Sequence, residues 1–297
     1  MAKDLFGNEI IEDILLRDRF IEPPFSVLDS RGGEWQQRKR RWEELGIKSE
    51  NGRKDELTYT GAAKQFDYYR VKEGKRDHSD EQSTSIFDPA LTELMYRWFC
   101  PDSGNILDPF AGGSVRGIVA HYLGYKYLGL ELRNEQVKSN IEQAKSILSQ
   151  DNQPLYIEGD AEILLDDLQS KRFDFVFSCP PYFDLEVYSD LPGELSAMDW
   201  GSFKIKYRTI IRKCINLLKP NCYACFVVGE IRDKKGFYRD FIGETKHAFI
   251  DNGAGLYNDA ILLNNVGSAS MRAGKQFDSG KKLCKIHQNV LIFKKLE

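Results

Sequence analysis

The sequence predicts an α/β protein with one mostly parallel sheet of seven strands, covered by helices, and a small amino-terminal extension. From about residue 83 onward, short β-branched or apolar runs alternate with helical patterns, which is typical of parallel strands joined by crossover helices. A length of 297 residues, with 41% hydrophobic and 29% charged residues, suits one catalytic domain plus an appendage. The residues before this point are more charged and contain few long apolar runs. We therefore expect an extension over residues 1–80 and a main domain over residues 81–297.

The elements of the main domain follow from hydrophobic periodicity. The predicted strands are Asn105–Leu107, Tyr127–Leu132, Leu155–Glu158, Phe173–Phe177, Ala224–Gly229, Ala260–Asn264 and Asn289–Phe293. The predicted helices between them are Val115–Leu123, Glu135–Leu148, Phe203–Leu218 and Tyr238–Asp251. Two segments do not fit the alternation and are expected to be loops, Phe183–Trp200 and Asn265–Lys285.

The extension contains one predicted helix, Glu34–Leu45, which lacks Gly and Pro. Trp35, Arg38 and Trp42 fall at helical spacing on one face of it. In one interpretation the tryptophans dock on the core and the cations face water. In the other, Arg38 and Arg41 bind nucleic acid.

Composition limits the partners. The formal net charge of −3 means that duplex DNA, which is held mainly through its phosphates, would have to be bound by a local basic patch. The second expected loop offers such a patch in Arg272, Lys275 and Lys281. No run approaches the roughly 20 apolar residues of a membrane span, and the first residues lack a signal-peptide pattern. We expect a cytoplasmic protein with no membrane partner and with its six scattered cysteines reduced.

A small-residue loop follows the first predicted strand of the main domain. Its sequence, Asp108–Ser114 (DPFAGGS), leads into a helix, so glycines and unpaired N–H groups meet a bound ligand at the helix start. The next strand ends in Glu131, where a carboxylate can accept from a ribose diol. After the third strand, Asp160 could hold an adenine amino group. Together these residues indicate a nucleotide-like ligand.

The fourth strand ends in Cys179-Pro180-Pro181-Tyr182. A Pro-Pro pair is a rigid platform with two fewer N–H donors, and the carbonyl of Pro180 can accept from an exocyclic NH₂. Tyr182 can present its ring to a base removed from its stack. Methylation of an aryl amine needs such preorganised acceptors, because the lone pair of the amine is conjugated with its ring.

With these two motifs the sequence resembles the DNA amino-methyltransferases, which make N6-methyladenine or N4-methylcytosine from S-adenosylmethionine. The segment Ser83–Pro89 is also similar to the family's segment beside the methionine part of the cofactor, and the arrangement is most similar to stand-alone methylases of phages and mobile elements. The resemblance implies a Rossmann-like class I methyltransferase fold. The cofactor-binding residues that it implies are Phe87, Asp108, Phe110, Gly112, Gly113, Glu131, Asp160 and Ser178. The catalytic residues that it implies are Cys179, Pro180, Pro181 and Tyr182.

One departure from the family concerns the position before Pro-Pro. The family has Asp, Asn or Ser there, but this chain has Cys179, and a thiol accepts hydrogen bonds weakly. Ser178 could supply the oxygen, or the carbonyl of Pro180 could suffice with help from Asp184 or Glu186. As a further alternative, Cys179 could attack a pyrimidine ring as a thiolate.

The predicted function is transfer of a methyl group from S-adenosylmethionine to the amine of a base flipped out of double-stranded DNA, with adenine N6 favoured over cytosine N4. Methylation of RNA or of a protein amide is an alternative, and so is a catalytically silent DNA-binding partner in a modification system. Cys222 and Cys225 have a two-residue metal spacing, but no second pair follows, so no metal site is predicted.

Overall fold

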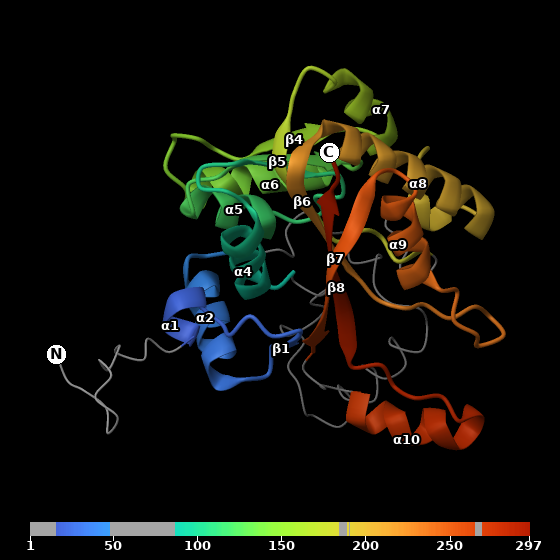
Figure 1. Cartoon of the computed structure of the whole chain (residues 1–297). Helices are drawn as coiled ribbons and strands as arrows, with labels where there is room; N and C mark the ends of the chain where they lie inside the picture. The colour runs from blue at the N-terminus through green and yellow to red at the C-terminus, as the bar shows by residue number, and fades with distance from the viewer. Residues whose placement is uncertain (1–15, 48–86, 184–188, 190, 265–268) are drawn as a thin grey trace, which may run out of the picture.

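The computed structural model describes residues 16–47, 87–183, 189, 191–264 and 269–297. These residues form one eight-stranded sheet in the order β1-β7-β8-β6-β5-β2-β3-β4, with helices on both faces (Figure 1). The strands are β1 Val27–Asp29, β2 Asn105–Asp108, β3 Lys126–Glu131, β4 Leu155–Glu158, β5 Phe173–Ser178, β6 Leu218–Val228, β7 Ala254–Leu263 and β8 His287–Lys295. Strand β8 runs antiparallel to its neighbours β6 and β7, and all other neighbours are parallel. The predicted mostly parallel α/β sheet is therefore confirmed.

The count of seven strands was wrong by one among the described residues. The missed strand, β1, is three residues long and pairs with β7 at the edge of the sheet. Val27 is half exposed, so no alternation of apolar and polar residues marks the strand in the sequence. The seven predicted strands all exist, although β6 and β7 begin six residues earlier than predicted, at Leu218 and Ala254.

The helices are α1 Leu16–Phe20, α2 Gly33–Glu44, α4 Pro89–Phe99, α5 Val115–Tyr122, α6 Asn134–Ile147, α7 Ala161–Asp167, α8 Trp200–Leu217, α9 Phe241–Ile250, α10 Ala269–Gly280 and the 3-10 turn η4 Leu195–Ala197. Each predicted helix is confirmed to within three residues. The loop predicted over Asn265–Lys285 is wrong in its middle, where α10 forms. Of the residues in α10, Ala269 alone is buried, so the helix lacks the apolar stripe that burial imposes on core helices.

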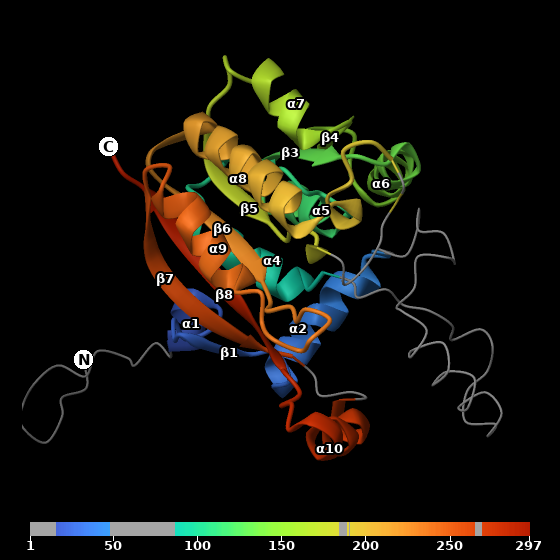
Figure 2. The same ribbon diagram turned by 90° about the vertical axis from the view of Figure 1, so that its right-hand side faces the viewer.

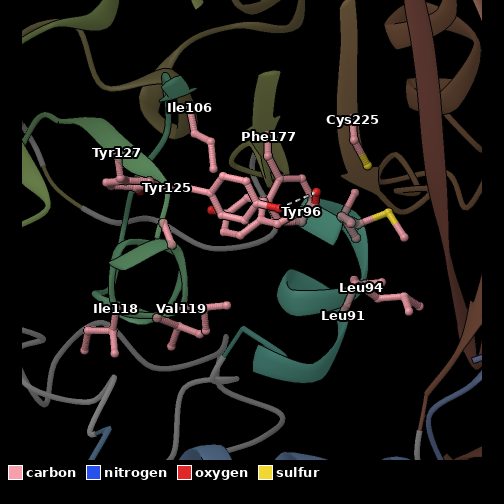
Figure 3. Close-up of a cluster of buried hydrophobic side chains, with 14 of the residues drawn as sticks. Leu91, Leu94, Tyr96, Ile106, Ile118, Val119, Tyr125, Tyr127, Phe177 and Cys225 are labelled. Atoms are coloured by element: carbon pink, nitrogen blue, oxygen red, sulfur yellow. Dashed lines mark hydrogen bonds between the residues drawn. The ribbon is translucent and has the colours of Figure 1, made fainter. Parts of the chain in front are cut away.

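The two faces of the sheet carry separate cores. On one face, α4 and α5 pack around Tyr96, whose ring contacts Phe177 of β5 at 5.5 Å between centroids (Figure 3). The hydroxyl of Tyr96 donates to the carbonyl of Arg116 in α5 at 3.1 Å. On the other face, α7, α8 and α9 cover the sheet (Figure 2), with Phe203 and Tyr207 of α8 at the centre of an aromatic cluster. Because both faces are covered, all six residues of β5 are buried.

The described part of the extension is joined to the main domain. Trp35 and Trp42 of α2 are buried in the core, and their indole N–H groups donate to Asp88 and Glu93 at 2.9 Å and 2.8 Å. The interpretation in which the tryptophans dock on the core is therefore confirmed. The predicted boundary near residue 80 lies outside the described residues, as do most of Ser83–Pro89 and the two proposed helpers, Asp184 and Glu186.

The connections place a crevice between β2 and β5. From β2 the chain continues outward through β3 and β4, and then returns to β5 on the other side of β2. Helices leave neighbouring strands on opposite faces at such a point, and ligands of open α/β sheets bind there, at the carboxyl ends of the strands. Among the described helices, none combines the length and the apolar character needed to cross a lipid bilayer.

Candidate active site

A cavity of about 840 Å³ lies at the carboxyl ends of β2, β3, β5 and β6. Its walls bring together most of the predicted site residues, although they come from distant parts of the sequence. The predicted residues that line it are Phe87, Phe110, Gly112, Gly113, Glu131, Asp160, Cys179, Pro180, Pro181, Tyr182 and Arg272. One part of the cavity is formed by Pro109–Gly113, Glu131 and Asp160; we call it the donor half, because the sequence predicts that it binds the methyl donor. The other part is formed by Cys179–Tyr182 and the ends of β7 and β8; we call it the target half, because the sequence predicts that it binds the base to be methylated.

Asp108 and Ser178 were predicted to contact the cofactor, but neither lines the cavity, and their contact with the cofactor stays a prediction. Asp108 is 0% exposed. Its carboxylate accepts hydrogen bonds from the hydroxyls of Ser178 at 2.6 Å and Tyr127 at 2.7 Å, and from the backbone N–H of Phe110 at 3.2 Å. The hydroxyl of Ser178 is buried and donates to Asp108, so in this structure Ser178 does not face the cavity.

A buried ion pair holds the loop from behind. Arg116, at the start of α5, donates through Nε to Asp108 at 2.5 Å and through Nη2 to the carbonyls of Phe110 and Ala111 at 2.7 Å and 2.9 Å. Burial alone would lower the pKa of Arg116, but the neighbouring charge of Asp108 outweighs it and raises that pKa. The guanidinium also lies 4.5 Å from the centre of the Phe87 ring. Asp108 and Arg116 therefore shape the loop, and Phe87 is fixed beside it.

Helix α6 supports the loop from the side, a role that the sequence did not indicate. Asn140 donates to the carbonyl of Gly112 at 2.7 Å and accepts from Gln136 at 3.0 Å, and Gln136 accepts in turn from Arg133 at 2.9 Å. Asn140 and Gln136 are each 1% exposed. These polar residues were not recognisable as loop partners, because they lie 24 to 28 positions further along the chain than Gly112.

Glu131 lies where the sequence predicted a ribose-binding carboxylate. Its Oε2 accepts from the backbone N–H of Gly112 and its Oε1 from that of Arg133, both at 3.0 Å. Burial raises the pKa of Glu131, against the lowering effect of the charge of Arg133. Nε of Arg133 lies 3.5 Å from Oε1 as well, and because an ionised carboxylate has about four lone-pair sites, Glu131 can still accept from a donor in the cavity.

Asp160 caps helix α7 and forms an ion pair. Its Oδ1 accepts from the backbone N–H of Glu162 at 2.9 Å, and its Oδ2 is paired with Lys206 of α8. Lys206 is 8% exposed. The loop that carries Glu194 packs closely on this pair, since a Cβ on Gly193 would lie 2.4 Å from Oδ2 of Asp160. Lys206 and Glu194, which both line the cavity, were not predicted as site residues.

In the target half, Cys179 and Tyr182 lie on the same wall. The Sγ of Cys179 is 3.8 Å from the hydroxyl oxygen of Tyr182. The hydroxyl of Tyr182 also accepts from Nε2 of Gln288 in β8 at 2.6 Å, and its ring meets that of Phe241 edge to face at 6.2 Å. The tyrosine ring is therefore held both at its tip and at its side.

The residue after the motif anchors the chain below it. Phe183 has a positive φ of 48° and is 4% exposed. Its ring packs edge to face against Trp200 at 5.1 Å and Phe203 at 5.3 Å, and the Arg239 guanidinium lies 4.8 Å from its centre. A left-handed backbone at a bulky residue is strained, so this packing has to compensate for the sharp turn after Tyr182.

Polar residues of β6, β7 and β8 complete the target half. Glu230 accepts from the backbone N–H groups of Phe241 and Ile242 at 3.3 Å and 2.9 Å, so it caps α9. Burial lowers the pKa of Lys285, although the charge of Glu230 opposes this, and burial together with Lys285 lowers the pKa of His287. Both residues line the cavity.

The predicted DNA-binding residues fall into two groups. Arg38 is directed at Glu93, with Nη1 3.4 Å from each carboxylate oxygen, and its contact with DNA stays a prediction. Arg41 is exposed, and Lys39 of the same helix lines the cavity, although it was not singled out. The cations of the second group, Arg272 and Lys275 on α10 and Lys281 just after it, are all exposed. Helix α10 projects from the body of the molecule beside the cavity (Figure 1).

Among the described residues, no group of three or more His, Cys, Asp or Glu side chains could hold a metal ion. Cys225 is buried in β6, and neither it nor Cys222 forms a disulfide.

Solved structures to which this chain is similar include methyltransferases. TrmN from Thermus thermophilus matches with a TM-score of 0.50 and 15% identity over 72% of this chain and 50% of that chain. Magnesium protoporphyrin IX methyltransferase (ChlM) from Synechocystis PCC 6803 with bound SAM matches with a TM-score of 0.45 and 12% identity over 78% of this chain and 91% of that chain. The chain spans about half the length of the TrmN chain. No curated protein sequence matches significantly. The fold is that of class I methyltransferases.

Part of the sequence is also similar to one protein family. A family model described as DNA methylase, N6_N4_Mtase, matches residues 27–143. This match confirms the predicted resemblance to the DNA N6-adenine and N4-cytosine methyltransferases, which use S-adenosylmethionine. It includes β1, α2 and the donor half as far as Glu131, whereas Pro180–Tyr182 lies beyond it. The placement among stand-alone methylases of phages and mobile elements, the link to restriction and modification and the cytoplasmic location stay predictions.

Proposed function

We propose that this protein is a DNA methyltransferase that transfers the methyl group of S-adenosylmethionine to the exocyclic amine of a base flipped out of a duplex, with adenine N6 favoured over cytosine N4. One observation carries the proposal. The cofactor loop and the Pro180–Tyr182 motif line the same cavity, from the ends of neighbouring parallel strands β2 and β5.

The donor half fits the cofactor. Gly112 has a positive φ of 52°, and a Cβ built on it would meet no described atom within 4 Å, so the backbone there is open to a ligand. Glu131 would accept from the ribose hydroxyls, while Asp160, steadied by Lys206, would hold the adenine amine. When bound there, S-adenosylmethionine would supply an electrophilic methyl group on its sulfonium.

The target half orients the amine. The carbonyl of Pro180 accepts a hydrogen bond from the target NH₂, which draws the nitrogen lone pair out of conjugation with the base. The ring of Tyr182 stacks on the flipped base and holds it in the plane of that carbonyl. The two proline rings keep this segment rigid.

Cys179 is not required as an oxygen-like acceptor in this scheme. Replacement of Cys179 by Ala should lower methyl transfer less than about 10-fold, because the loss of one weak hydrogen bond costs about 1 kcal/mol. If Cys179 attacked a pyrimidine ring, the same variant would lose activity completely.

DNA is held by cations around the mouth of the cavity. We assign this role to Arg272 and Lys275 of α10, to Lys281 just after it, and to Lys39 and Arg41 of α2. Because the chain has a net charge of −3, binding should depend on this patch and weaken strongly with salt.

The experiment that tests the proposed function is incubation with S-adenosyl-[methyl-³H]methionine and either DNA from cells without amino-methylation, total RNA or a protein mixture. Nucleoside mass spectrometry of the labelled product then identifies the base. We expect label in DNA as N6-methyladenine. Label in RNA or protein alone would transfer the proposal to those substrates, and no label anywhere would indicate a silent partner.

A further inference from the structure

The glutamine at the beginning of β8 reaches the catalytic tyrosine from the other side of β6. Gln288 lies on the reversed strand, two places along the sheet from β5, which carries the Pro-Pro-Tyr motif. We propose that Gln288 is a positioning residue that fixes the ring and the hydroxyl hydrogen of Tyr182 for methyl transfer. This inference rests on the proposed function, because it assumes that Tyr182 stacks on the target base.

The polarity of the contact is defined by the groups around Gln288. Nε2 lies 2.6 Å from the hydroxyl oxygen of Tyr182, and Oε1 accepts from Nδ2 of Asn264 at 3.5 Å. An amide nitrogen has no acceptor capacity, so the phenol oxygen must accept from it. The hydroxyl of Tyr182 is then left to donate its own hydrogen elsewhere.

The sulfur of Cys179 can receive this hydrogen. Its Sγ is 3.8 Å from the hydroxyl oxygen, which is within the longer range of hydrogen bonds to sulfur. A hydrogen bond from the hydroxyl of Tyr182 to this sulfur would restrain the side chain of Cys179 next to Pro180 and Pro181. The chain of contacts from Gln288 through Tyr182 thus ends on Cys179, at the position before Pro-Pro, while the carbonyl of Pro180 remains the acceptor for the target amine.

The orientation of the Tyr182 ring depends on the contacts at its edge and at its hydroxyl end. The ring packs edge to face on Phe241, and Gly229 lies close to its tip, where a Cβ would be in ordinary contact at 3.9 Å from Cζ and from the hydroxyl oxygen of Tyr182. An aromatic ring that must stack on an incoming base is most effective when its orientation is fixed beforehand. The hydrogen bond from Gln288 provides that restraint at the end of the ring.

The test is a double-mutant cycle in the full-length protein. Tyr182→Phe removes the hydroxyl but keeps the ring, and Gln288→Leu removes the donor. Each should lower the rate of ³H-methyl transfer to unmethylated DNA about 5- to 20-fold, and the double variant should be within about 2-fold of either single variant. Affinity for S-adenosylmethionine should stay within about 2-fold in all of them. Gln169→Leu, distant from the cavity, is the matched control and should be unchanged.

Gln288→Glu tests the direction of the hydrogen bond. A carboxylate accepts rather than donates, so the hydroxyl of Tyr182 would turn toward it and away from Cys179. We expect a loss as large as in Gln288→Leu, and the same change in the Tyr182→Phe background measures the effect of its charge on DNA binding alone. Full activity of Gln288→Glu would overturn the claim that residue 288 must donate a hydrogen bond to the hydroxyl oxygen of Tyr182.

Two outcomes overturn the inference while leaving the proposed function intact. These are additive losses in the cycle and unchanged transfer by Gln288→Leu. If the wild type labels no DNA, the proposed function fails and the inference fails with it. The unfolding midpoints of the wild type, the two single variants and the double variant identify this case. If the shifts in midpoint are not additive and no protein transfers a methyl group to DNA, the contact between Gln288 and Tyr182 forms but does not serve DNA methylation.

Discussion

The donor half and the target half of the cavity are built in different ways. The donor loop is fixed by buried groups on two helices, Asp108 with Arg116 of α5 and Asn140 of α6. The target half is held by a partly buried contact from Gln288 and borders on α10, which is almost wholly exposed. The comparison teaches that the donor half is fixed mainly by buried groups, whereas the target half lies next to an exposed helix, which agrees with our proposal that its substrate is a base drawn out of a duplex.

The largest effect should come from breaking the ion pair behind the loop. Replacement of Asp108 by Ala leaves the charge of Arg116 buried without its partner, which should destabilise the protein by about 3–5 kcal/mol and abolish cofactor binding. Urea unfolding and titration calorimetry with S-adenosylmethionine measure both. Asp108→Asn keeps one acceptor oxygen, so it can accept at the position of Ser178 or of Tyr127 but not at both, and its stability and cofactor affinity should fall between those of Asp108→Ala and the wild type. Wild-type stability and cofactor affinity in Asp108→Ala would show that the loop does not depend on this pair.

Loss of the stacking ring should separate the two halves. Tyr182→Ala should lower methyl transfer to DNA about 100-fold, because base stacking on an aromatic ring is worth about 1–3 kcal/mol. Cofactor affinity should remain within about 2-fold, as measured by calorimetry. An equal loss of cofactor affinity would contradict the assignment of Tyr182 to the target half.

A substitution in α6 should have a smaller effect than Tyr182→Ala, and it should change cofactor affinity instead of DNA binding. Asn140→Leu removes the hydrogen bond to the carbonyl of Gly112 and leaves that buried oxygen with one donor fewer, so the dissociation constant for S-adenosylmethionine should rise about 5- to 10-fold. The Michaelis constant for DNA should not change. A change in the constant for DNA alone would place Asn140 in the wrong half.

The cations at the rim should affect binding through salt. Replacing both Arg272 and Lys275 by Ala should reduce the slope of log affinity against log salt concentration by about two, in a DNA-binding titration. Arg38→Ala is the matched control on α2, and the slope should not change, because Arg38 is turned toward Glu93. A reduced slope in Arg38→Ala together with an unchanged slope in the double variant would mean that Arg38 of α2, and not the cations of α10, contacts DNA phosphates.

The smallest effect concerns the exposed pair beside β1. The hydrogen bond from Arg31 lowers the pKa of Asp29 to about 2. Since the pKa is depressed on folding, the contribution of Asp29 to stability is present above its usual value of 3.8 and is lost as the pH falls toward 2. Because the pair is exposed, Asp29→Asn should shift the unfolding midpoint at pH 7 by less than about 1 °C. A larger shift would mean that β1 contributes more to stability than its exposure indicates.

The sequence predicted the parts of the site that lie in consecutive order along a strand and its following loop. Phe110, Gly112, Glu131 and Asp160 fall at strand ends, and the sheet geometry brings strand ends together. The orientation of a side chain at such an end was not predictable. Asp108 points into the core because Arg116 and Tyr127 offer donors there, and both contacts depend on packing between elements.

The supporting residues are also invisible in the sequence. Asn140, Lys206 and Gln288 act from the next helix or strand in space, and no spacing rule links them to the residues that they contact. The same reason explains the missed α10 and β1. Neither has the buried face that creates a hydrophobic period.

The most direct test of the account is a crystal structure with S-adenosylhomocysteine. We expect the ribose hydroxyls at the carboxylate of Glu131, the adenine beside Asp160 and the sulfur facing the carbonyl of Pro180. Binding of the ligand elsewhere, or with its sulfur turned away from Pro180, would contradict the claim that the two halves of the cavity hold donor and target side by side.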